Sequence, residues 1–122
     1  MDILKVWNTL EMFRMMVADM PSSDPKFRAW LGIYPINPNS VAGCQFLTRQ
    51  GVAKFTGQSF FHVRFLELDV KFLSDNYHPC ESDFATITSQ LVRGRLGLAT
   101  ALHEFGVAVV DLKMPYESDY PI

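Results

Sequence analysis

The chain has 122 residues, of which 48% are hydrophobic and 20% are charged, and its formal net charge is −2 at pH 7. This length suits a single domain that folds without a metal or disulfide, and the composition excludes a disordered chain. The acidic balance argues against nucleic acid as the main partner. No stretch approaches the roughly 18 apolar residues of a membrane span, and the N-terminus lacks a secretory signal, so we expect a cytoplasmic protein with no membrane partner.

Apolar residues recur at helical spacing near the N-terminus and predict a long helix from Asp2 to Met20. The residues that form this stripe are Ile3, Val6, Trp7, Leu10, Phe13, Val17 and Met20. We expect Asp2 to cap the helix and Pro21 to end it. Three methionines beside the stripe leave a homodimer contact open.

Prolines then indicate a connector over residues 21–43, with a short helix from about Pro25 to Leu31. Three strands are predicted after it, over residues 41–48, 51–55 and 60–73. In the last of these, the apolar phase slips once between Phe65 and Leu66, which predicts a β-bulge. The alternation favours a sheet with one covered face and one solvated face.

The C-terminal part predicts a helix from Ser82 or Asp83 to about Phe105, with a break near Arg93 to Arg95 and a stop at Gly106. A strand over residues 107–112 and a tail over residues 115–122 follow. The expected fold is a single α+β domain spanning residues 1–122. It has a long N-terminal helix, an antiparallel sheet of three to five strands, and a C-terminal helix or helix pair packed on the sheet.

The two cysteines, Cys44 and Cys80, suit a reducing compartment, and a disulfide between them is the alternative. Cys80 follows His78 and precedes the expected helix start, where a thiol pKa can fall, so a cysteine-dependent enzyme is one alternative. A catalytic cysteine usually finds its histidine far away in sequence, and we expect no catalytic residue. We expect no metal because Glu81 and Asp83 complete no zinc motif, and no cofactor because no glycine-rich phosphate loop is present.

The segment Gly94-Arg95-Leu96-Gly97 resembles the GxxG loop of KH domains. In that family the loop joins two helices and clamps a nucleic-acid backbone. The resemblance covers about residues 87–112 and implies a second alternative, a nucleic-acid-binding module.

Charge is distributed unevenly along the chain. Residues 1–66 hold seven Lys and Arg against four Asp and Glu, whereas residues 67–122 hold four against nine, so the balance changes from +3 to −5. An acidic, aromatic surface suits a basic partner. The residues that we expect to bind this partner are Glu67, Asp69, Asp111, Tyr116, Glu117, Asp119 and Tyr120.

In size, acidity and lack of catalytic groups, the chain resembles small bacterial inhibitor or immunity proteins. This resemblance is one of type and depends on no motif. It implies a protein-binding domain that blocks a basic toxin or nuclease by covering its site. Charge complementarity would speed the association of the two proteins.

Overall fold

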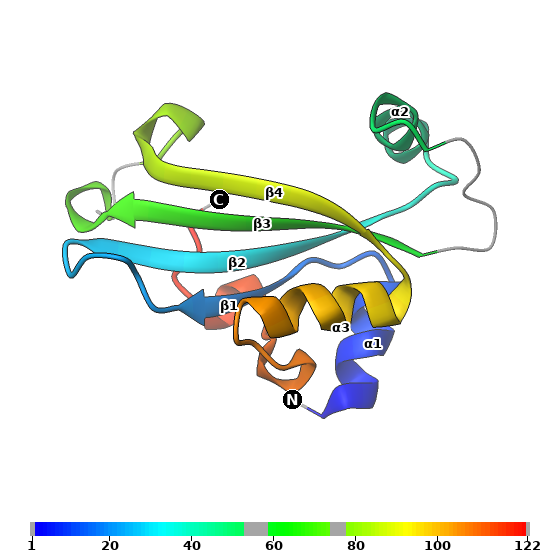
Figure 1. The fold of residues 1–122 in the computed structure, drawn as a ribbon, viewed down its shortest axis with the longest axis horizontal. Coiled ribbons are helices and arrows are strands. Elements are labelled where there is room, and N and C mark those ends of the chain that lie inside the picture. The colour runs from blue at the N-terminus through cyan, green and yellow to red at the C-terminus, as the bar shows by residue number, and fades with distance from the viewer. Residues whose placement is uncertain (1, 53–58, 74–77, 122) are drawn as a thin grey trace.

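The computed structural model describes residues 2–52, 59–73 and 78–121 and shows an α+β domain with three helices and a four-stranded antiparallel sheet (Figure 1). The strands follow one another across the sheet in chain order, and each is antiparallel to the next. The helices and strands are α1 (Ile3–Glu11), β1 (Met16–Met20), β2 (Phe27–Ile36), α2 (Val41–Arg49), β3 (Phe60–Asp69), β4 (Phe84–Arg93) and α3 (Gly94–Glu104). The expected α+β fold is therefore confirmed. None of the helices in the described ranges has the length and apolarity to cross a membrane.

The main core lies between one face of the sheet and the helices α1 and α3, which lie next to each other in Figure 1. The side chains that fill it include Val6 and Leu10 of α1, Leu98 and Leu102 of α3, and Leu31, Ile33, Phe61 and Val63 of the sheet. Burial of these apolar side chains is the main source of stability in a domain of this size. It also fixes the position of α3 relative to β4.

The N-terminal helix is shorter than the sequence predicts. Asp2 caps it as expected, because its carboxylate accepts a hydrogen bond from the backbone N–H of Lys5 at 3.0 Å. The helix ends at Glu11, the chain turns at Phe13 with a φ of 58°, and β1 begins at Met16. The first three residues of β1 are buried, and a strand buried on both faces has no alternating pattern to distinguish it from a helix.

Two further predictions in the first half are wrong. The helix expected from Pro25 to Leu31 is instead a turn followed, from Phe27, by β2, whose middle five residues are all buried. The strand expected over residues 41–48 is α2, which begins after Ser40, whose hydroxyl accepts a hydrogen bond from the Gly43 N–H at 3.0 Å. The strand expected over residues 51–55 falls mostly outside the described residues.

The helix predicted from Ser82 to Phe105 is wrong in its first half, which is β4. The predicted break is the point where β4 changes into α3, at Gly94, whose φ of 75° suits a glycine. Gly106 also has a φ of 75° and ends the helix as expected. The strand predicted over residues 107–112 is a short 3-10 turn, Val109–Asp111.

Strand β3 confirms the predicted alternation, but its phase change has another cause. Phe61 and Val63 are buried on the helix-covered face, whereas Leu66 and Leu68 are fully buried on the opposite face. The pairing with β2 is regular through Phe65, and the irregularity lies between Glu67 and Leu68 in the pairing with β4. The prediction of a bulge between Phe65 and Leu66 is therefore wrong. Because the second face is also covered, apolar residues of both phases are buried.

Candidate functional site

The C-terminal segment, residues 112–121, is attached to the sheet at several points. Its Lys113 forms an isolated antiparallel bridge to Val17 of β1, with N···O distances of 2.8 Å in both directions. Farther along, the Asp119 carboxylate accepts hydrogen bonds from the guanidinium of Arg28 at 2.8 Å and the indole N–H of Trp30 at 3.0 Å. These bonds hold the segment against the face of the sheet opposite the helices.

Tyr120 completes this attachment. Its hydroxyl lies 2.5 Å from the Tyr34 hydroxyl, and its ring meets Trp30 edge-on at 6.5 Å between ring centroids. Gly32 lies beneath it, because a Cβ atom there would come within 2.5 Å of the Tyr120 hydroxyl oxygen. Burial and the hydrogen bond with Tyr34 raise the pKa of Tyr120. Asp119 and Tyr120, both expected to contact a partner, thus form contacts within the chain.

Glu67, which we expected to contact a partner, does not lie on a solvated face. Its side chain is only 5% exposed and accepts hydrogen bonds from the backbone N–H and the hydroxyl of Ser23, at 2.8 and 2.9 Å. These bonds fold the β1–β2 connection onto the sheet. Asp69 is half-buried and accepts a hydrogen bond from the Lys71 N–H at 3.0 Å.

Substitution of Glu67 by Gln is expected to flatten the dependence of stability on pH. The hydrogen bond from the Ser23 backbone is the main cause that lowers the pKa of Glu67, and it outweighs the effect of burial. Because the folded-state pKa lies below the unfolded value of about 4.3, the carboxylate stabilises the fold above that value and loses this contribution as pH falls through the folded pKa. Urea denaturation between about pH 6 and 3 checks this. Equal pH slopes for both proteins would contradict it.

Besides Asp119, three of the predicted residues are exposed to solvent. Tyr116 is 83% exposed and lies on the 3-10 turn Pro115–Glu117. The Glu117 carboxylate accepts a hydrogen bond from the Met114 N–H at 3.1 Å, and the Asp111 carboxylate accepts one from the Ala108 N–H at 2.9 Å. Neither carboxylate forms an ion pair with any residue that the structure describes.

A hollow of about 410 Å³ lies beside β1 and contains Asp19, Asp111 and Lys113 in its lining. Burial alone would raise the pKa of Asp19, but hydrogen bonds from Lys113 and Ser118 and the charges of Lys113 and Arg28 lower it overall. The sequence offered no signal for Asp19 because the residue fell inside a predicted helix. Among the charged residues that line this hollow, Asp111 forms no ion pair within the described ranges.

Cys80 is exposed, and its sulfur lies 3.0 Å from the Ser82 hydroxyl and 3.4 Å from the Asp83 carboxylate. Cys44 and Cys80 are both free thiols, so no bridge joins them. The described residues contain no group of three or more His, Cys, Asp or Glu side chains arranged to hold a metal ion.

Substitution of Cys80 by Ser is expected to leave stability and partner affinity within a few-fold of the original protein. The hydroxyl of serine can take the place of the thiol between Ser82 and Asp83. Calorimetric titration with the partner measures the affinity. A loss of several orders of magnitude in a folded variant would restore the hypothesis of thiol chemistry.

The Gly94–Gly97 segment does not form the expected helix–loop–helix arrangement, because α3 starts at Gly94 directly after β4. Arg95 pairs with Glu11 of α1, and its guanidinium lies 5.1 Å from the Trp7 ring centroid. The segment therefore joins α3 to α1, and its structure does not resemble a KH loop between two helices.

A basic hollow of about 470 Å³ lies between α2 and the sheet and includes Arg49, His62 and Arg64 in its lining. Arg64 pairs with Glu81 at 3.1 Å. Burial, and then the charge of Arg64, lower the pKa of His62, so this imidazole is neutral at pH 7. Arg49 is left as the main positive charge, which is little for binding a nucleic-acid backbone.

Comparison of the chain with models of protein families, with curated proteins and with solved structures finds no match. A proposal for the function therefore rests on the side chains described above.

Proposed function

We propose that this chain is a small protein-binding domain that recognises a basic protein and blocks its functional site, as inhibitor or immunity proteins block a toxin or nuclease. The observation that carries the proposal is the exposed Tyr116 ring, presented on a turn of a C-terminal segment that is bonded to the sheet. The Glu117 carboxylate belongs to this segment, and the Asp111 carboxylate directly precedes it in the chain.

The charges of the C-terminal part support a basic partner. Over residues 94–121, the cations Arg95 and Lys113 are paired with Glu11 and Asp19. Arg93, at the end of β4, forms no ion pair with the described residues, and its guanidinium lies 5.2 Å from the Phe60 ring centroid. By contrast, three carboxylates of this part form no ion pair with the described residues, and they belong to Glu104, Asp111 and Glu117. A surface with surplus negative charge attracts cationic side chains and raises the rate of association.

Tyr116 supplies an apolar contact area, which charged side chains alone do not provide. A tyrosine buries a large apolar ring and keeps a hydroxyl for hydrogen bonding, which is why it is common among residues that dominate binding energy. The turn that carries it is closed by hydrogen bonds from Glu117 N–H to Met114 and from Ser118 N–H to Pro115. A preordered turn reduces the entropy that binding would otherwise cost.

Affinity capture from the source cells with the immobilised chain tests the proposal, with Tyr116→Ala immobilised as the matched control. We expect the chain to retain a protein with an isoelectric point above about 9, and the variant to retain much less. One equivalent of the chain should also abolish the activity of the purified partner. Capture of nucleic acid alone, or of a partner that stays active when saturated, would contradict the proposal.

A further inference from the structure

The two edges of the sheet differ in how they are protected. The outer edge of β1 meets the backbone of Lys113, whereas β4 pairs only with β3 among the described residues. Residues 84–92 of β4 include no charged residue and no proline, which are the usual devices that keep another strand away from an edge. At its middle, Thr88, Ser89 and Gln90 are all exposed. The backbone of β4 can therefore pair with one more strand.

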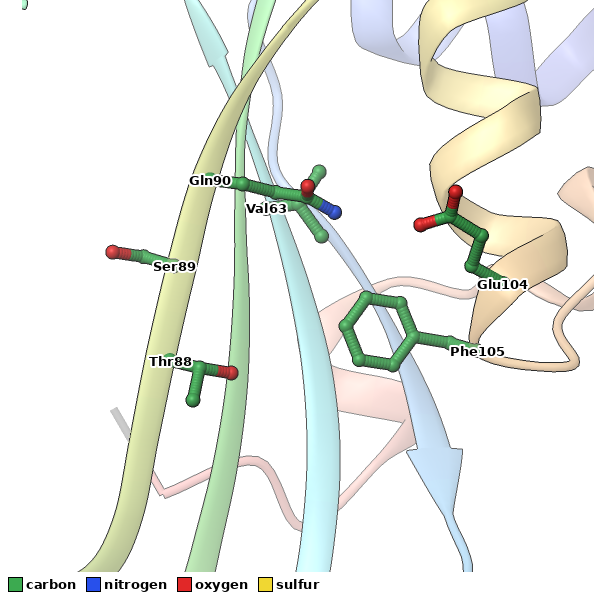
Figure 2. Close-up of a pocket in the computed structure, with 6 residues that line it drawn as sticks. All are labelled: Val63, Thr88, Ser89, Gln90, Glu104 and Phe105. Atoms are coloured by element: carbon green, nitrogen blue, oxygen red, sulfur yellow. The ribbon is translucent and has the colours of Figure 1, made fainter.

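A hollow of about 390 Å³ lies beside this edge (Figure 2). Gln90 and Thr88 of β4 point toward the side of the sheet where Glu104 and Phe105 lie at the end of α3, whereas Ser89 points away. The register agrees, because Gln90 is paired with Val63, which faces the core. The hollow thus combines an apolar wall with a carboxylate.

The Glu104 carboxylate makes no hydrogen bond or ion pair within the part of the chain that the structure describes, and the residue is exposed. Apolar surface from Phe105 and Val63 lines the same hollow. This arrangement suits a Lys or Arg side chain, whose hydrocarbon stem packs on apolar groups while its charged end pairs with a carboxylate.

We propose that the outer edge of β4 takes up an extended segment of the basic partner as a fifth strand, with a Lys or Arg of that segment in the hollow against Glu104. This inference rests on the proposed function and identifies the surface that would recognise the partner. In such strand addition, backbone hydrogen bonds provide affinity, and pockets for alternate side chains provide specificity. Successive side chains point to opposite faces, so every second residue of the segment faces the hollow.

A second copy of the chain fits this site less well. If residues 84–92 of two copies paired with each other, the residues beside the hollow would carry no positive charge, because Arg93 lies beyond that stretch. Gln90 or Thr88 of one copy would then face Glu104 of the other without balancing its charge. A basic segment balances it, and the partner is the chain that we expect to be basic.

The test uses NMR titration of the isotope-labelled chain with a synthetic ten-residue peptide that alternates Thr and Val around one central Lys. We expect amide shifts confined to β4 and the end of α3. Glu104→Gln, or norleucine in place of the peptide's Lys, should each weaken binding about tenfold, and the two changes together should weaken it little further. Ser89→Ala is the matched control, because its side chain points away from the hollow. The spectrum of each variant reports its folding.

Shifts outside β4 and the end of α3, or equal affinity of the Glu104→Gln variant, would overturn the inference. So would sedimentation showing that the free chain already forms a dimer through β4. The captured partner separates this inference from the proposed function. If Tyr116→Ala weakens partner binding but Glu104→Gln does not, strand addition fails and the proposed function stands. If the peptide binds β4 but no basic partner is inhibited, the proposed function fails.

Discussion

Truncation of the chain after Met114 is expected to lower the free energy of unfolding by roughly 3–5 kcal/mol, a loss typical of removing a large side chain from a core. Trp30 is fully buried and contacts the Tyr120 ring, and its indole N–H donates to Asp119. The truncation removes both partners and exposes the indole to water. Urea denaturation followed by tryptophan fluorescence measures the effect.

A Tyr120→Phe variant is the control for this truncation. It keeps the ring against Trp30 and loses only the hydroxyl contact with Tyr34, so it should cost about 1 kcal/mol. A truncated protein that unfolds at the same urea concentration as the full chain would show that the segment does not stabilise the sheet.

Substitution of Tyr116 by Ala is expected to weaken partner binding by at least about 30-fold, which corresponds to about 2 kcal/mol. Stability should not change, because the Tyr116 side chain is 83% exposed and contributes little to the core. Calorimetric titration with the captured partner, together with urea denaturation of the variant, separates the two effects.

Tyr116→Phe is the matched variant, and we expect it to keep most of the affinity because the ring supplies most of the buried area. Affinity of Tyr116→Ala within twofold of the original would remove this residue from the interface. A fall in stability equal to the fall in affinity would indicate a structural role instead.

The sequence predicted those elements of the fold that depend on the chemistry of residues close together in the chain. Asp2 could be identified as a cap, Gly106 as a helix end and β3 as a strand, because each has a signal of residue type or alternation. By contrast, β1 and β2 could not be recognised. Both are buried on two faces, and such strands lose the alternation that marks a half-buried strand.

The candidate surface could be predicted only in part. The exposed positions of Tyr116, Asp111 and Glu117 agree with the sequence interpretation of an acidic, aromatic C-terminal part. The burial of Glu67 depends on Ser23, 44 residues earlier, and no local pattern reports that contact. Likewise, Glu104 could not be placed beside Gln90, because the segment that contains β4 was predicted to be helical.

The dependence of the association rate on salt tests most directly whether the acidic surface recognises a basic partner. Stopped-flow mixing of the chain with the captured partner should give a rate constant that falls at least tenfold between about 20 and 300 mM NaCl, because salt screens attraction between opposite charges. Neutralising Asp111, Glu117 and Glu104 together should make this dependence much shallower. A rate constant that is independent of salt, or that rises with it, would contradict the account.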